Sequence, residues 1–180
     1  MKNLLAISQS EEANWLFKAD HHYLSARLLY LHNLIFSAEE NAGLAIELIL
    51  KCACKKKNIS ITNTKHDIPT LWKKAKPPFN LDEGYENYLR KLETILNSRH
   101  PDANEWTRGR KGNDDYDSLD FLYLKLRRWI VEMFSNNERI KSEVDLAKAN
   151  QELFNNAHSR HGAWKLTTIL KRSNTSYNLI

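Results

Sequence analysis

The segment from Ala42 to Cys54 constrains the fold of this chain more than any other. Drawn as a helix it is apolar on nearly all sides, and Glu47 and Lys51 are its only charged residues. A helix that is apolar all round is stable only when other elements surround it. The whole chain has only five Gly and four Pro in 180 residues, so few positions break a helix. We therefore expect an all-α fold with this segment as its central, buried helix.

The spacing of apolar residues predicts the helices that surround this segment. We expect an up-and-down bundle of five core helices over residues 10–135, with a loop from Pro101 to Tyr116 before the fifth. An additional helix and a basic tail follow over residues 136–180 and pack on the bundle or exchange with a second copy. No structure is predicted for residues 159–180. The predicted helices cover about residues 10–33, 37–57, 67–76, 81–97, 118–134 and, for the sixth, 135–154.

Several function classes are excluded by composition. No stretch approaches the ~20 apolar residues of a membrane span, and no signal-peptide core follows Met1, so we expect a cytoplasmic protein without a membrane partner. Cys52 and Cys54 point about 200° apart on a helix and are expected to be reduced core residues. The residues of Asp20-His21-His22 lack the spacing of a zinc site and are expected at the surface or half-buried. We expect no metal and no cofactor.

The net charge of +5 is unevenly distributed along the chain. Between Lys51 and Lys76 there are eight lysines and a single acid, Asp67. Such a patch attracts phosphate backbones, but lysines also accumulate at helix C-termini because of the helix dipole. Both interpretations stay open. The candidate contacts to RNA or a nucleotide are Lys51, Lys55, Lys56, Lys57, His66, Lys73, Lys74 and Arg99.

Three short segments stand in a characteristic order: 45–51 (Ala-Ile-Glu-Leu-Ile-Leu-Lys), 65–68 (Lys-His-Asp-Ile) and 98–102 (Ser-Arg-His-Pro-Asp). With helical patterns on both sides, this order resembles the HEPN family of small all-helical domains, which is associated with RNA cleavage and nucleotide binding. The resemblance covers about residues 11–134, and His100 departs from it where the family usually has Tyr. It implies a homodimer and a nucleotidyltransferase-type partner protein, in the manner of toxin and antitoxin pairs.

The same segments have a plain structural interpretation. Glu47 and Lys51 form a pair four residues apart, and a carboxylate in a buried helix needs partners that His66 or Arg99 can supply. Asp67 is placed to cap the third helix, and Asp102 is a typical turn residue. We therefore expect a structural polar network rather than a nucleotide pocket. Its members are Glu47, Lys51, His66, Asp67 and Asp102.

Catalysis would require more than these residues provide. Catalytic HEPN members are similar in having an Arg followed, four to six residues later, by a His near the last core helix, whereas Arg127 and Arg128 have no His after them before His158. Arg27 and His32 match this spacing only in the first helix, where they point about 140° apart. Arg99 and His100 are the better weak candidates for phosphate binding and proton transfer.

We accordingly expect an HEPN-like protein that binds RNA or a nucleotide and acts with a partner. One alternative is a metal-independent endoribonuclease toxin that uses Arg99 and His100, or Arg27 and His32 across a dimer. The other is a non-enzymatic adaptor whose basic face binds an acidic protein.

Overall fold

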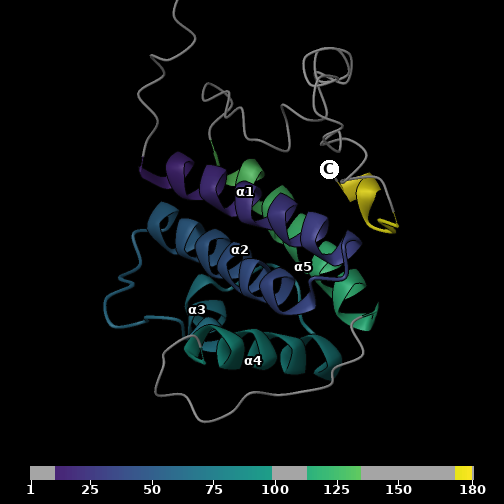
Figure 1. Ribbon diagram of the computed structural model, residues 1–180. Helices are drawn as coiled ribbons and strands as arrows, with labels where there is room; N and C mark the ends of the chain where they lie inside the picture. The colour runs from purple at the N-terminus through teal and green to yellow at the C-terminus, as the bar shows by residue number, and fades with distance from the viewer. Residues whose placement is uncertain (1–10, 99–112, 135–172, 180) are drawn as a thin grey trace, which may run out of the picture.

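The computed structural model describes residues 11–98, 113–134 and 173–179, and within these it is all helical (Figure 1). The all-α expectation is therefore confirmed. The predicted sixth helix and most of the basic tail lie outside the described residues. The helices are α1 (Glu11–Leu31), α2 (Ile35–Lys56), α3 (Ile68–Ala75), α4 (Glu83–Asn97) and α5 (Asn113–Met133), with a 3-10 turn, η2, at Tyr177–Leu179.

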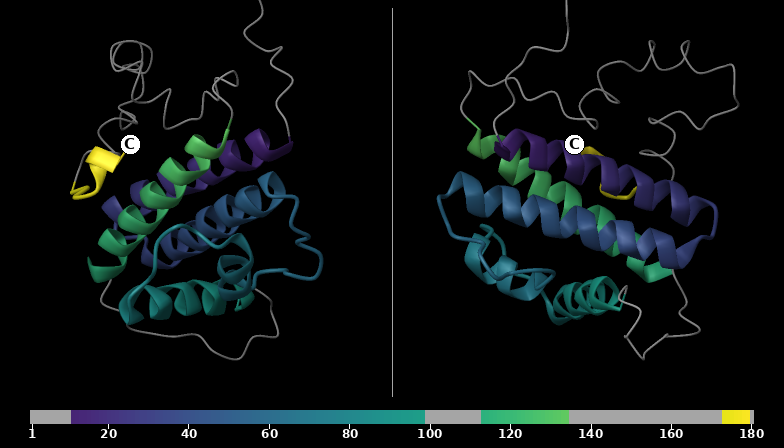
Figure 2. Two further views of the ribbon diagram at one scale, coloured as in Figure 1. Left: turned by 180° about the vertical axis from the view of Figure 1, so that it is seen from behind. Right: turned by 60° about the vertical axis from the view of Figure 1, so that its left-hand side comes forward.

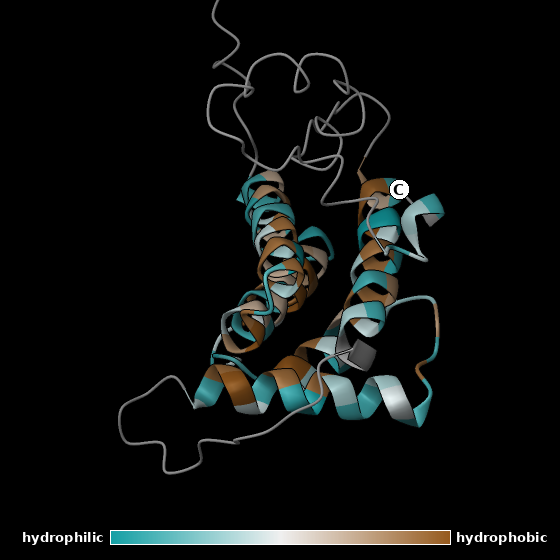
Figure 3. Ribbon diagram, turned by 45° about the vertical axis from the view of Figure 1, so that its right-hand side comes forward, coloured by the Kyte–Doolittle hydropathy of each residue, from teal (hydrophilic) through white to brown (hydrophobic). Residues whose placement is uncertain are grey.

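Helix α2 occupies the centre and contacts α1, α3, α4 and α5. Figure 2 shows α1 and α2 lying side by side with α5 crossing them, while α3 and α4 cover a different side of α2. Apolar and polar residues alternate along the helices in Figure 3, as expected when one face of each helix packs in a core. The long apolar segment of the sequence is thus the helix with the most neighbours.

Glycine at position 43 lets α4 approach this central helix. A Cβ added at Gly43 would lie 2.9 Å from the side chain of Leu96 on α4. That separation is shorter than a van der Waals contact, so even an alanine would force the Leu96 side chain to move.

Helices α3 and α4 begin where the sequence provides caps. The backbone N–H of Thr70 donates to the Asp67 carboxylate at 2.8 Å, and Pro69 lies in the first turn of α3, where its missing N–H is harmless. Asp82 caps α4 in the same way by accepting from the Tyr85 N–H at 3.0 Å. Helix α3 ends at Ala75, and Lys76 follows it in a left-handed conformation, just before the two prolines that predict the end of the helix.

Helix α5 begins earlier than the sequence predicts. Its first residue is Asn113, whereas the expected loop extends to Tyr116. The expected loop includes the acidic residues at this point, but carboxylates are also favourable in the first turn of a helix because of the helix dipole. Tyr116 adds tertiary packing, since its ring contacts Tyr30 edge to face with 5.2 Å between centroids. This contact with a residue far away in the sequence favours the earlier start of the helix.

Both cysteines lie in the core, as the sequence predicts. Cys52 and Cys54 are both free and fully buried, and burial raises the pKa of the Cys52 thiol to about 12. Among the described helices, none has the length and apolar character needed to cross a membrane.

Part of the C-terminal tail lies against the bundle. The described residues 173–179 contact α5 through η2, which is drawn in yellow in Figure 2. The side-chain amide of Asn174 also donates to the Tyr23 hydroxyl of α1 at 3.3 Å. The described residues of the tail therefore lie against both α5 and α1.

Candidate functional site

Glu47 and Lys51 of α2 meet His66, which precedes α3. The Glu47 side chain is only 4% exposed, and its carboxylate accepts from the Lys51 ammonium on one oxygen. Its other oxygen lies 2.9 Å from Nδ1 of His66, which is 28% exposed. We call Glu47, Lys51 and His66 the Glu47 cluster. Both carboxylate oxygens have a partner, so the expected contacts of Glu47 with Lys51 and His66 are present.

The other members of the predicted network are placed differently. Asp67 is engaged as the cap of α3 rather than in the Glu47 cluster. Arg99, His100 and Asp102 lie outside the described residues. Among the described residues, no group of three or more His, Cys, Asp or Glu side chains is arranged to hold a metal ion.

Arg27 and His32, the weaker pair of catalytic candidates, lie in different surroundings. Arg27 is completely buried and forms an ion pair with the buried Asp120 of α5, whereas His32 is exposed beyond the end of α1. A guanidinium that is enclosed and already neutralised is poorly suited to meet a phosphate from solution. The position of Arg27 is explained by packing between two helices.

Arg27 belongs to the first half of a polar network between α1 and α5 that the sequence analysis did not predict. Besides its ion pair with Arg27, the Asp120 carboxylate accepts from the Tyr23 hydroxyl at 2.7 Å. All three side chains are fully buried. A carboxylate from α5 thus binds a tyrosine and an arginine from α1.

The second half repeats this arrangement with the two helices exchanged. The Asp20 carboxylate on α1 accepts from the Tyr123 hydroxyl at 2.6 Å and from Nε of Arg127 at 2.9 Å. The rings of Tyr23 and Tyr123 stack at the centre, with 4.3 Å between centroids and 12° between planes. We call the two halves together the reciprocal network. It also corrects the expectation that Asp20 lies at or near the surface, because Asp20 is fully buried.

The two tyrosines of the reciprocal network are strongly perturbed. Desolvation is the main cause that raises the pKa of Tyr23 and of Tyr123 well above the usual 10, and the neighbouring aspartate adds to the effect in each case. Both hydroxyls therefore stay protonated as hydrogen-bond donors. Their role is structural, because each hydroxyl donates to an aspartate of the facing helix.

A signal for the reciprocal network was present in the sequence. The pattern Asp-x-x-Tyr-x-x-x-Arg occurs at residues 20–27 and again at residues 120–127. These spacings put the three side chains on one face of a helix, and two such faces are complementary when the helices run in opposite directions. A search for self-similar polar patterns would have found the pair.

The lysines at the end of α2 are largely occupied. Lys55 forms an ion pair with Glu11 at 3.1 Å, and the Lys56 ammonium lies 4.4 Å from the ring centroid of Phe134. These contacts use the positive charge within the protein, which lowers its availability for a phosphate group.

Two further lysines bind backbone carbonyl groups. The Lys57 ammonium donates to the carbonyl of Ala75 at 2.7 Å, at the C-terminus of α3. Lys74 donates to the carbonyl of Ser60 at 3.1 Å. Both therefore act as expected of cations near free carbonyl groups.

Lys73 and Lys76 are arranged differently from Lys55, Lys56, Lys57 and Lys74. Both are exposed, and within the described part of the chain neither has an ion-pair partner. They line a hollow of about 400 Å³ at the end of α3, together with the rings of Trp72 and Phe79. These rings contact each other edge to face at 5.4 Å between centroids. Glu86 is the one acid that lines the hollow.

The sequence analysis named Lys73 as a candidate but missed the aromatic side chains beside it. Their signal is the run from Trp72 to Phe79, in which three lysines stand between two aromatic residues. Aromatic rings next to cations are typical of surfaces that bind single-stranded nucleic acid.

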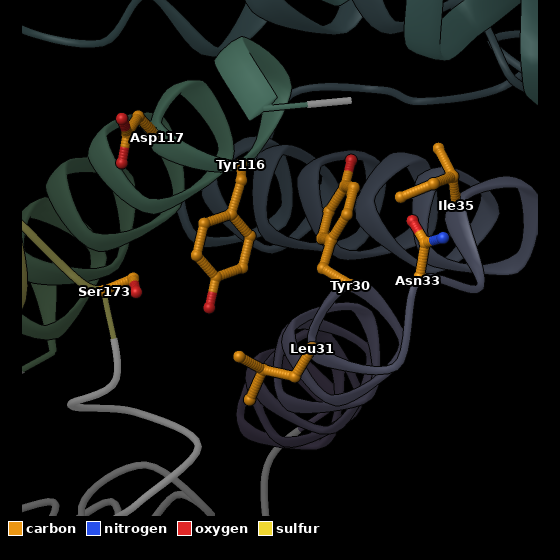
Figure 4. Close-up of a pocket in the computed structure, with 7 residues that line it drawn as sticks. All are labelled: Tyr30, Leu31, Asn33, Ile35, Tyr116, Asp117 and Ser173. Atoms are coloured by element: carbon orange, nitrogen blue, oxygen red, sulfur yellow. The ribbon is translucent and has the colours of Figure 1, made fainter. Parts of the chain in front are cut away.

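A second cavity, of about 360 Å³, lies where the end of α1 meets the start of α5 (Figure 4). Tyr30 and Tyr116 stand in its middle, with Asp117 and Ser173 on the Tyr116 side and Asn33 on the Tyr30 side. Arg27 lies beneath it, with its guanidinium carbon 4.6 Å from the centroid of the Tyr116 ring. This cavity has no counterpart among the predicted site residues.

Comparison with protein-family models, with curated proteins and with solved structures gives no match to this chain. The HEPN resemblance thus has only the three segments and the helix order in its support.

Proposed function

We propose that this protein is an HEPN-like protein that binds RNA or a nucleotide through the hollow at the end of α3. The observation that carries this proposal is the presence of Lys73 and Lys76 beside Trp72 and Phe79 around one hollow. The lysines would meet phosphate groups while a base packs against an aromatic ring, and each such stacked base contributes about 1–3 kcal/mol.

The contrast among the lysines favours this hollow over the rest of the basic patch. Lys51, Lys55 and Lys57 already bind acidic or carbonyl oxygens of the protein. Moving any of them to a phosphate would break an internal contact, whereas Lys73 and Lys76 would lose none within the described residues. Phosphate binding by these two lysines therefore carries a smaller internal cost than binding by Lys51, Lys55 or Lys57.

The wider features of the proposal come from the HEPN resemblance. It implies a homodimer and a nucleotidyltransferase-type partner, as in toxin and antitoxin pairs, in a cytoplasmic setting. The Glu47 cluster would then be a structural element beside the binding surface, because both oxygens of its carboxylate are occupied.

Fluorescence anisotropy with a labelled single-stranded RNA at several salt concentrations tests the proposal. The double variant Lys73→Gln/Lys76→Gln should bind more weakly, and its slope of log affinity against log salt should shrink by about 1.4, or about 0.7 for each lost phosphate contact. The matched control is Lys18→Gln/Lys55→Gln, which removes the same charge from exposed or paired sites and should behave nearly like the parent. Equal losses in both variants, or absence of RNA binding, would contradict the proposal.

The ribonuclease alternative is separated by adding a metal chelator to the same RNA. Cleavage that persists in the chelator and disappears in Arg99→Ala or His100→Ala would assign catalysis to those residues. Intact RNA with salt-dependent binding would support the binding function.

A further inference from the structure

The chain turns sharply just after α3, between the two aromatic walls of the hollow. Trp72 lies before the turn and Phe79 lies after it, and their rings contact each other. Lys73 and Lys76 line the same hollow. The shape of the hollow therefore depends on how the backbone turns at residues 76–78.

Lys76 has a backbone conformation at this turn that its sequence does not favour. Its φ of 48° lies in the left-handed region, where the Cβ of a residue other than glycine is crowded. Pro77 follows it, and a residue before proline favours an extended backbone. A conformation that is disfavoured for both reasons persists only when surrounding contacts hold it.

Lys57, just after the end of α2, supplies such contacts. Its ammonium donates to the carbonyl of Ala75 at 2.7 Å and to the carbonyl of Lys76 at 3.4 Å. The same ammonium lies 4.7 Å from the ring centroid of Trp129 on α5. One side chain thus connects two consecutive carbonyl groups of the turn to α2 and α5.

We propose that Lys57 is a positioning residue for RNA binding, which holds the backbone at Lys76 so that the lysines and the aromatic rings face one hollow. This role rests on the function proposed for the hollow, and it differs from the direct RNA contact for which the sequence made Lys57 a candidate. Two of the three N–H donors of the ammonium are already engaged by the turn. Its charge therefore serves the turn rather than the ligand.

The effect on RNA should be a change in population. Without Lys57 the turn opens for part of the time, and the apparent affinity falls in proportion to the fraction of molecules that keep the hollow. The bound complex still makes the same phosphate contacts. Affinity should therefore fall while its dependence on salt stays the same.

Fluorescence anisotropy of the full chain with the labelled single-stranded RNA tests this role. Lys57→Met keeps an unbranched side chain without the donors, and it should bind about fivefold more weakly, or by ~1 kcal/mol, with the salt slope of the parent. Lys57→Arg retains a cation with several N–H donors and should recover most of the affinity. Because Lys57 is exposed, we expect both variants to fold.

Lys74→Met is the matched control. It also removes one positive charge and one lysine–carbonyl hydrogen bond, but that bond goes to Ser60, outside the turn. RNA affinity should change less than about twofold. In NMR spectra without RNA, the indole N–H signal of Trp72 should shift more in Lys57→Met than in Lys74→Met.

Three results would overturn this inference while leaving the proposed function in place. One is an affinity of Lys57→Met within about twofold of the parent. Another is a salt slope that shrinks by about 0.7, which would make Lys57 a direct phosphate contact. The third is an equal loss of affinity in Lys57→Met and Lys74→Met. Absence of RNA binding by the parent chain would instead reject the proposed function itself, and this inference with it.

Discussion

The reciprocal network and the Glu47 cluster use similar residue types in opposite surroundings. In the reciprocal network every side chain is buried, and Asp120 and Arg27 form an ion pair. In the Glu47 cluster the carboxylate is buried, but Lys51 and His66 are 17% and 28% exposed. The first cluster joins two helices far apart in the sequence, and the second joins α2 to the segment that follows it.

This difference shows what each cluster contributes. A buried charge that loses its partner has no solvent to replace it, so the reciprocal network specifies how α1 meets α5. A partly exposed charge that loses its partner recovers hydration, so the Glu47 cluster adds little to stability. The reciprocal network, which the sequence analysis did not predict, therefore contributes more to stability than the Glu47 cluster does.

Removing one buried carboxylate gives the largest expected effect. Asp120→Ala leaves Arg27 without its ion-pair partner and Tyr23 without its acceptor, which should lower the free energy of unfolding by about 3–5 kcal/mol. Asp20→Ala should have an effect of similar size, because Asp20 has the same role in the other half. Urea unfolding followed by circular dichroism measures both.

A double replacement provides the control for that prediction. Asp120→Leu/Arg27→Met removes both charges and should recover most of the lost stability, since it leaves no unpaired buried charge. If Asp120→Ala unfolded within about 1 kcal/mol of the parent, the reciprocal network would be no more important than a surface pair.

Alkaline pH should have the next largest effect, and should lower the free energy of unfolding through buried tyrosine and cysteine side chains. The pKa values of Tyr23 and Tyr123 are raised well above 10 and that of Cys52 to about 12, so the folded state holds these protons more tightly than the unfolded state. Their stabilisation is complete below about pH 8.5 and is lost as pH rises toward the folded values, at up to ~1.4 kcal/mol per group for each pH unit. Urea midpoints at about pH 8 and 10.5 measure this loss.

Single substitutions assign the alkaline effect to its groups. Cys52→Ala should flatten the pH dependence by removing one titrating group, and Tyr123→Phe should flatten it while retaining the stacked ring. An unchanged slope in both variants would show that other groups are responsible.

A substitution in the Glu47 cluster should change the free energy of unfolding least. Glu47→Gln keeps the shape of the side chain and removes its charge, while Lys51 and His66 can turn to solvent, so the free energy of unfolding should fall by about 0.5–1 kcal/mol. The same urea experiment measures it. A loss of free energy of unfolding as large as that of Asp120→Ala would mean that both clusters stabilise the fold equally.

Much of the fold followed from local patterns. The apolar segment around Glu47 predicted a central helix, and Asp67 with Pro69 predicted the start of α3, because these features depend on neighbouring residues alone. The start of α5 at Asn113 did not follow, since the acidic residues there suit both a loop and a first helical turn. The contact of Tyr116 with Tyr30, far away in the sequence, favours the helix.

The candidate sites likewise include contacts that the sequence predicted and contacts that it did not. The pairing of Glu47 with Lys51 depends on helical spacing and was predictable, as was the capture of a buried carboxylate by His66. The hollow beside Lys73 was predictable only in part, because composition counts charges without showing which ones the protein already uses. The contacts of Lys55 with Glu11 and of Lys57 with Ala75 became evident only in the folded chain.

By itself the sequence determined that this chain is helical, that residues 42–54 form its centre and that its cysteines are reduced core residues. These properties follow from periodicity and hydrophobicity over short distances. Only the tertiary structure decided that Asp20 and Asp120 are buried, which lysines remain available and where the two cavities lie. Each of these depends on which distant segments meet, and burial changes the energy of a charge far more than any local preference does.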